Sequence, residues 1–273
     1  MADDQQTIVS PAVAAARLQS RRIRRGLTLP LVLLAVWWAA YAFGWTDSKL
    51  FVAPATVVET GARLLAEGEL GHALGLSLLR DVAGLTIGAS SGLVVGILLG
   101  LSRWSRLLIG PTLHTIKQIS LFAWIPLIMV WFGLGEMSKI VFISLAAFFP
   151  VLLNTFEGVG SVSRDLVEVS RVFVFSRLQL IRHVVIPSAM PSIFTGFYLA
   201  LIYSWLATLG AEYLLTSGEG IGNLLSDGRE NFWMDQILVG IFIVGLVGFA
   251  LNWLAAQLEK RLLRWRGPSA LHK

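Results

Sequence analysis

The chain has 273 residues, of which 55% are hydrophobic and only 14% are charged, and its mean hydropathy is +0.71. Soluble domains carry about 25% charged residues, so this composition nearly excludes a soluble enzyme, and its apolar content excludes a disordered chain. The absence of cysteine excludes disulfides, thiolate metal sites and cysteine nucleophiles, and the four histidines show no ligand spacing. We interpret the formal charge of +5 as basic loops against anionic lipid headgroups, and not as a nucleic-acid interface.

Uncharged runs of at least 17 residues occur six times along the chain. They predict about six membrane-spanning helices, because about 20 helical residues cross the hydrocarbon core of a bilayer. Two runs are near the lower length limit, which leaves five spans open. The runs are 26–46, 82–102, 118–135, 140–156, 183–211 and 236–258. The predicted fold is an all-α membrane protein with a tail at 1–26, a transmembrane domain at 27–259 and a second tail at 260–273.

Basic residues gather in both tails and in alternate links, for example at Arg103 and Arg106 after the second run. Acidic residues dominate the opposite links. The positive-inside rule therefore places both termini in the cytoplasm. The first run also has an alternative interpretation as a cleaved signal peptide, with Ala40-Tyr41-Ala42 as the cleavage motif. Its length, its tryptophans and the odd number of spans that cleavage leaves all favour a retained helix.

The second run carries a glycine at every fourth position. In lipid, helices gain no hydrophobic energy from meeting, so the loss of side chains favours association by permitting close backbone approach. These glycines are Gly84, Gly88, Gly92, Gly96 and Gly100. Packing within the chain, a subunit interface and a pathway wall all remain open for them. Arg80-Asp81, at the start of the run, is interpreted as a local interfacial pair.

Candidate pathway residues are few. Lys117 and Gln118 precede the third run, where the cation either receives an anionic substrate or extends to the cytoplasmic interface. Pro126 and Pro191 lie in the third and fifth runs and mark either a bend in a pathway or an ordinary helix start. Glu212 ends the fifth run, either as part of an outer gate or as a marker of the headgroup boundary.

The link at 160–187, between the fourth and fifth runs, has apolar residues at helical spacing with arginines between them. Leu166, Val169, Val172 and Phe173 form the first such set. The pattern predicts two short amphipathic helices at the cytoplasmic surface, the second ended by Pro187. Taken alone, it is also typical of an interfacial helix pair lying on lipid.

Glu168-Val-Ser170, followed at the family interval by Ile186-Pro187, resembles the "EAA" loop of permease subunits of binding-protein-dependent ABC importers. The similarity extends from about residue 28 to about residue 265 and includes Trp124-Ile-Pro126, Ala211-Glu212 and Gly220-Ile-Gly222. These motifs are most similar to the subgroup that serves aliphatic sulfonates, taurine, nitrate and bicarbonate.

Val174 departs from the resemblance, because the family has a glycine at this position of the loop. Glycine permits a turn with positive φ, which a β-branched residue does not adopt cheaply. We therefore expect the turn between the two short helices to be built differently in this chain.

The resemblance implies a type I importer permease whose loop docks on a cytoplasmic ATPase. The implied coupling residues are Glu168, Val169, Ser170, Arg171, Val172, Phe173, Val174, Ile186 and Pro187. The chain lacks a Gly-x4-Gly-Lys-Ser/Thr phosphate loop, so we expect no enzymatic activity and no cofactor or metal of its own, with ATP bound by the partner. Further implied partners are an external binding protein, contacted by turn glycines such as Gly218, and a second copy of the chain in the bacterial inner membrane.

Several alternatives remain at this stage. The first is an importer of the same kind that carries nitrate, bicarbonate, an aromatic acid or a vitamin precursor. A secondary transporter or channel is the second, and it predicts inverted repeats and no ATPase partner. An intramembrane enzyme is the third, but it requires convergent histidine or carboxylate side chains within the runs.

Overall fold

The computed structural model describes residues 28–44, 51–215 and 218–262, and the chain divides into two compact units, 1–59 and 60–273. All secondary structure in the described residues is helical, which confirms the all-α prediction. The predicted tail 1–26 and nearly all of the predicted tail 260–273 lie outside the described residues.

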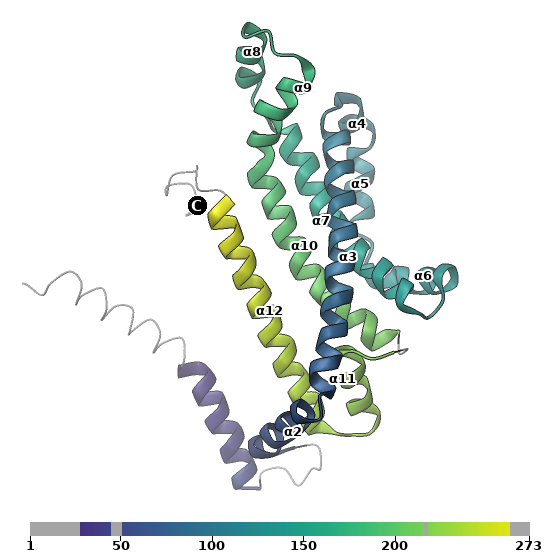
Figure 1. Cartoon of the computed structure of the whole chain (residues 1–273), viewed down its shortest axis with the longest axis vertical. Coiled ribbons are helices and arrows are strands. Elements are labelled where there is room, and N and C mark those ends of the chain that lie inside the picture. The colour runs from purple at the N-terminus through teal and green to yellow at the C-terminus, as the bar shows by residue number, and fades with distance from the viewer. Residues whose placement is uncertain (1–27, 45–50, 216–217, 263–273) are drawn as a thin grey trace, which may run out of the picture. The chain divides into compact units, whose positions relative to one another are not determined.

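The first unit contains the apolar helix Thr28–Ala42 and the start of α2. The second unit holds the remaining helices (Figure 1). In chain order the labelled elements are α2 Pro54–Ala66, α3 Glu69–Gly100, α4 Arg103–Leu108, α5 Gly110–Ile116, η1 Leu121–Trp124, α6 Ile125–Phe132, α7 Glu136–Gly160, α8 Arg164–Val172, α9 Arg177–Leu180, η2 Ile181–Val185, α10 Ile186–Leu214, α11 Ile221–Glu230 and α12 Met234–Leu262.

Among the described residues, four helices are long and apolar enough to cross a membrane: Glu69–Gly100, Glu136–Gly160, Arg177–Leu214 and Met234–Arg261. A bent pair, α5 with η1–α6, makes a fifth candidate, and the helix Thr28–Ala42 is apolar but shorter. The predicted run 82–102 is only the second part of α3. That helix begins at Glu69 and continues through Arg80 and Asp81, which are both buried.

The predicted run 118–135 is not one continuous helix. α5 ends at Ile116, and the η1–α6 segment leaves at an angle of 87° to it. Pro126 lies in the first turn of α6, where the missing backbone N–H has no helical partner to lose. Pro126 therefore marks a helix start, and the break falls at residues 117–120. Pro191, in contrast, lies inside α10.

The five regularly spaced glycines lie in the second half of α3, where they pack against α7 along nearly the whole length of that helix. A Cβ added at Gly84 would lie 2.5 Å from the Ile143 side chain, and one at Gly92 would lie 2.6 Å from the Phe148 carbonyl oxygen. At the far end, a Cβ at Gly100 would lie 2.8 Å from Val159. Close backbone approach maximises dispersion contacts, which are the main attraction between helices in lipid. The spacing therefore serves packing within the chain.

A methyl group in this seam must push the two helices apart. We predict that Gly92→Ala lowers the free energy of unfolding by about 1–3 kcal/mol, the usual cost of overpacking. Gly75→Ala is the matched control, since nothing lies within 4 Å of a Cβ at this glycine of the same helix. Thermal unfolding of both variants in nanodiscs measures the difference, and equal stability of the two contradicts the packing role.

Candidate functional site

The link after α7 folds into two short helices, as its amphipathic spacing predicts. The side chain of Ser163 caps α8 by accepting the Leu166 N–H at 3.3 Å. Ser176 and Gln179 form a reciprocal capping box at the start of α9, with bonds of 3.3 and 2.8 Å. Such caps satisfy N–H groups that the first helical turn leaves unpaired. In Figure 1, α8 and α9 form one end of the second unit, beyond α10.

Pro187 does not end the second short helix, contrary to the sequence prediction. α9 continues through the π-helical turn η2 into α10, and Pro187 lies in the first turn of α10. The wider π turn changes the hydrogen-bond register directly before the residue that lacks an N–H. The end of the link is consequently continuous with the longest candidate span, Arg177–Leu214.

The turn between α8 and α9 is built in the way that glycine would build it, so the expectation of a different turn was wrong. Val174 has a φ of +55°. Its N–H donates to the Arg171 carbonyl at 3.0 Å, and the Phe175 N–H donates to the Ser170 carbonyl at 3.1 Å. This pair of bonds is a Schellman motif with Val174 at the position where glycine is usual. Both bonds are satisfied while Val174 remains in a strained conformation.

The outer face of this link is apolar and exposed. Val169, Val172 and Phe173 have 53%, 81% and 69% of their surface accessible, and Val174 is also exposed. Glu168 and Arg171 are exposed beside them. Ser170 differs, because it is buried and donates its hydroxyl to the Val167 carbonyl at 2.6 Å. We call the exposed set Glu168, Val169, Arg171, Val172, Phe173 and Val174 the α8 face.

A second group of predicted and unpredicted residues surrounds Glu212 in α10. Its side chain is completely buried within the protein, so it does not face lipid headgroups directly. The carboxylate accepts hydrogen bonds from the Ser77 hydroxyl at 2.8 Å, from Arg80 Nη1 at 2.6 Å and from the Gly222 N–H at 2.9 Å. Ser77 also accepts the Ile221 N–H at 3.0 Å. The carboxylate thus ties α3 and α10 to the first turn of α11.

Arg80 is the central cation of this buried network. Besides Glu212 it binds Glu136 of α7, through Nε and through a 2.8 Å bond from Nη2, and it donates to the Glu219 carbonyl at 2.6 Å. Lys139, also buried, lies 3.6 Å from the Glu136 carboxylate. The predicted local pair with Asp81 is wrong. Asp81 instead accepts from the Thr208 hydroxyl of α10 at 3.2 Å.

Glycines of the loop before α11 pack directly on this network. A Cβ at Gly220 would lie 2.5 Å from the Glu212 carboxyl carbon, and one at Gly218 would lie 3.2 Å from a Glu136 oxygen. Gly222 would meet the Glu212 side chain at 2.5 Å. The absence of side chains at these glycines therefore lets the backbone lie directly against Glu136 and Glu212. The sequence analysis interpreted them only as external turn residues. That interpretation also missed Ser77, Glu136 and Lys139.

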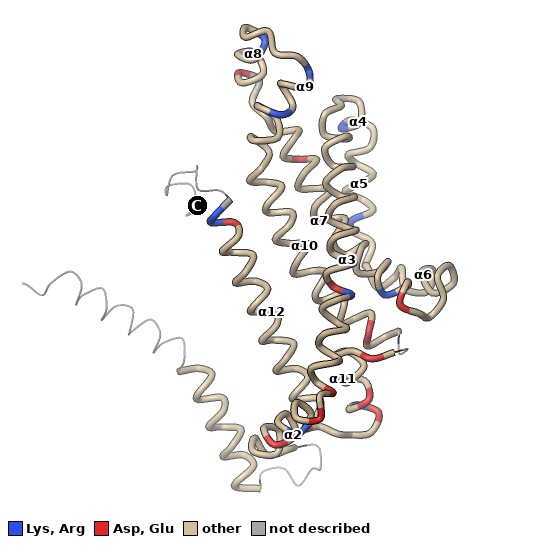
Figure 2. The backbone as a smooth tube through the Cα atoms, in the orientation of Figure 1, with Lys and Arg blue, Asp and Glu red and all other residues tan. Residues whose placement is uncertain are grey.

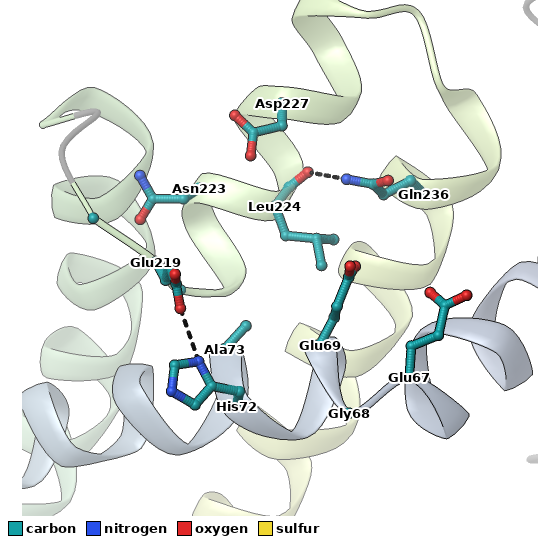
Figure 3. A pocket seen from close by; sticks show the side chains of 12 residues that line it. Glu67, Gly68, Glu69, His72, Ala73, Glu219, Asn223, Leu224, Asp227 and Gln236 are labelled. Atoms are coloured by element: carbon teal, nitrogen blue, oxygen red, sulfur yellow. Dashed lines mark hydrogen bonds and ion pairs between the residues drawn. The ribbon is translucent and has the colours of Figure 1, made fainter.

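A hollow of about 470 Å³ is lined by residues from the start of α3, from the loop before α11 and from α11 itself (Figure 3). Four carboxylates line it: Glu67, Glu69, Glu219 and Asp227. His72 Nδ1 lies 2.8 Å from a Glu219 oxygen, and Gln236 donates to the Leu224 carbonyl at 3.1 Å. A cleft lined by one sign of charge repels ligands of the same sign. This hollow is therefore a poor resting place for an anion.

Another pocket, of about 500 Å³, opens where the α5–α6 span is broken. Lys117 and Gln118 both line it, together with residues of α7 and α10 such as Pro150 and Tyr203. The predicted pathway residues Pro126 and Glu212 are not among its lining residues. The structure therefore groups Lys117 with Gln118 and places Glu212 in a separate network.

The chain was compared with known proteins. The family described as "Binding-protein-dependent transport system inner membrane component" matches residues 92–264. The chain belongs to this family. The aliphatic sulfonates transport permease protein SsuC of Bacillus subtilis (strain 168) is 38% identical over 242 residues, covering 89% of this chain and 87% of that protein. The taurine transport system permease protein TauC of Escherichia coli (strain K12) is 31% identical, covering 92% and 96%.

The fold of the permease also matches solved structures. A chain from inward-facing conformations of the MetNI methionine ABC transporter superposes with a TM-score of 0.58 at 17% identity, covering 72% of this chain and 97% of that one. The type I importer permease fold is thereby confirmed. The chain is a multi-pass inner-membrane permease of an ABC importer, which works with a separate ATPase and an external binding protein.

Relieving the strain at Val174 gives a first prediction for the permease. A left-handed conformation costs a non-glycine residue about 1–2 kcal/mol, so Val174→Gly should strengthen the turn or leave it unchanged. Val172→Gly, in the last turn of α8, is the control and should weaken the helix by about 0.5–1 kcal/mol. Hydrogen exchange at the Phe175 amide reports both effects. Faster exchange in Val174→Gly contradicts the assignment.

Replacement of Arg80 should leave the buried Glu212 carboxylate without its cation and so destabilise the permease. We predict that Arg80→Met lowers the free energy of unfolding by about 3–5 kcal/mol, as for other broken buried pairs. Combining it with Glu212→Gln should recover part of the loss, since no charge is then left alone. The control is Arg63→Met in the exposed Arg63–Glu67 pair, which should change stability by about 0.5 kcal/mol or less. Thermal unfolding in nanodiscs distinguishes these cases, and equal effects of the two arginine variants refute a structural network.

Proposed function

We propose that the permease imports a small organic anion, with an aliphatic sulfonate as the cargo class, and that its α8 face docks on the ATPase subunit. The observation that carries this proposal is the exposure of the α8 face at one end of the helices. Exposed apolar residues rimmed by charge are typical of a protein-binding surface. Val172 and Phe173 supply apolar contact area, and Glu168 and Arg171 supply charges that set the register of a partner.

The continuity of the link with α10 supports a mechanical role for this docking. A force applied to α8 passes through the short turn at 173–176 into α9, and α9 continues through the π turn into α10 without a further loop. α10 in turn holds Glu212, which binds the first turn of α11. We therefore propose that ATP-driven movement of the docked α8 face reorients α10, and that the network at Glu212 forms part of an outer gate. Bistable packed elements of this kind are the usual carriers of such transitions.

Two copies of the permease are proposed to form the transport pathway on a two-fold axis. One chain has one coupling link, whereas a pair of ATPases offers two docking grooves, so a symmetric pair is the simplest assembly. Both termini are proposed to be cytoplasmic, together with the α8 face. Figure 2 supports a cytoplasmic α8 face, since acidic residues cluster around α11 and basic residues lie around α8 and α9.

The proposed cargo draws on the names of the relatives, because the permeases SsuC and TauC are named for aliphatic sulfonates and for taurine. Taurine is itself a sulfonate, with an ammonium group that makes it a zwitterion, so what the two names share is the sulfonate group. Lys117 and Gln118 are proposed as pathway residues that this anion meets. Nitrate, bicarbonate, an aromatic acid and a vitamin precursor are the competing cargoes.

Reversing a charge on the α8 face should weaken docking of the ATPase and thereby impair the transporter. We predict that Glu168→Lys reduces binding-protein-stimulated ATP hydrolysis and sulfonate uptake by about tenfold or more, in line with the loss of an interfacial charge pair. Glu230→Lys, an exposed carboxylate at the end of α11, is the matched control and should retain ATPase docking. The measurement is uptake and hydrolysis in proteoliposomes that contain the permease, ATPase and binding protein.

Two outcomes contradict the proposal. Unchanged uptake and hydrolysis in Glu168→Lys, at equal permease content in the membrane, exclude the docking role. Accumulation of solute by vesicles that contain the permease alone identifies it as a secondary transporter, which needs no ATPase.

A further inference from the structure

Lys117 lies deep within the membrane-spanning helices, and not at their cytoplasmic end. It lines its pocket beside Pro150 of α7, which is ten residues before the end of that helix at Gly160. At 1.5 Å per residue this places Pro150 about 15 Å from that end of α7. A lysine among membrane-spanning helices is costly unless it faces protein or a water-filled cavity, and it marks a functional site by default.

The backbone beside Lys117 gives a second, independent indication. Residues 117–120 separate α5 from η1, and the two segments diverge by 87°. Backbone that is not helical is tolerated at membrane depth only where protein buries it or where it lines a cavity that holds water. Gln118 and Ser120 of this break both line the pocket. The break therefore borders the pocket that residues of α7 and α10 also line.

The pocket has two chemically different sides. Lys117, Gln118 and Asn154 contribute an ammonium and two amides. The Asn154 amide nitrogen already donates one bond to the Pro150 carbonyl at 2.8 Å, which leaves its second N–H for a ligand. Among residues 28–44, 51–215 and 218–262, no carboxylate forms an ion pair with Lys117. The polar side therefore offers one uncompensated positive charge and several donors.

The remaining walls are apolar and aromatic. Trp124, Leu145, Phe149 and Leu206 line the rest of the pocket, which at about 500 Å³ lies within the range of small-molecule sites, about 300–1,000 Å³. Nitrate or bicarbonate would be held at the polar side and would leave these walls without a partner. A hydrocarbon tail attached to the anion would cover them and gain free energy from leaving water.

We propose that this pocket is a binding subsite of the permease itself, and that it selects monovalent organic anions with an apolar tail, such as alkanesulfonates. This inference rests on the proposed function as an anion importer and deepens it. The single charge of Lys117 matches one sulfonate group, and the apolar walls give the permease a preference of its own, independent of the external binding protein.

Equilibrium dialysis of the permease–ATPase complex in nanodiscs, without binding protein, tests the subsite. The probes are radiolabelled methane-, ethane-, propane- and butanesulfonate, with nitrate as a competitor and empty nanodiscs of the same lipid as the blank. We expect saturable binding that strengthens by up to about fourfold per methylene group. Nitrate should compete poorly.

Substitutions of Lys117 separate charge recognition from partition into the pocket. Lys117→Gln should weaken butanesulfonate binding by about tenfold or more, the value of a hydrogen bond to a charged group. Lys117→Arg should retain most of it. Lys260→Gln, an exposed lysine near the end of α12, is the matched control and should bind as the wild type does.

The inference fails if no saturable binding occurs, if affinity does not depend on chain length, or if Lys117→Gln binds as well as the control. Uptake by the complete transporter separates this failure from failure of the proposed function. Sulfonate uptake without a Lys117-dependent subsite removes the subsite alone. A subsite that binds alkanesulfonates, in a transporter that imports none of them, removes the proposed cargo alone.

Discussion

The buried guanidinium of Arg80 requires carboxylate partners inside the apolar helices, and this constraint determines the arrangement of the permease around it. The guanidinium meets carboxylates from α7 and α10, and the carbonyl of Glu219 completes its shell. In a low-dielectric interior, a buried charge that has lost its partner strongly lowers the stability of the fold. The pairing therefore specifies which helices are neighbours and fixes the loop before α11 against them.

The glycine seam and the network have complementary roles. The seam brings the second half of α3 close to α7 but carries no directional bonds. The network supplies direction, because hydrogen bonds to Glu212 require specific donors from α3 and α11. Close packing transmits displacement, since a packed interior has low compressibility. Movement proposed to start at α8 can thus reach α11 through α10 with little loss.

Local patterns predicted local structure well. The spacing of Leu166, Val169 and Val172 indicated α8 correctly, because an amphipathic period does not depend on distant residues. The start of α3 was missed because the charges of Arg80 and Asp81 indicated the end of an apolar run. The partner that neutralises Arg80 is Glu212, which is 132 residues away in the sequence. The turn at Val174 was misjudged for a related reason. Its two backbone bonds hold a conformation that the residue's own preference opposes.

Hydrogen exchange along the permease, alone and in complex with its ATPase in nanodiscs, tests the account most directly. It predicts that amides of the first turn of α11, among them Gly222, exchange slowly in both samples because the Glu212 network holds them. Amides of residues 164–174 should become protected only in the complex. Equal exchange of α8 with and without the ATPase, or rapid exchange of Gly222 in both samples, would contradict it.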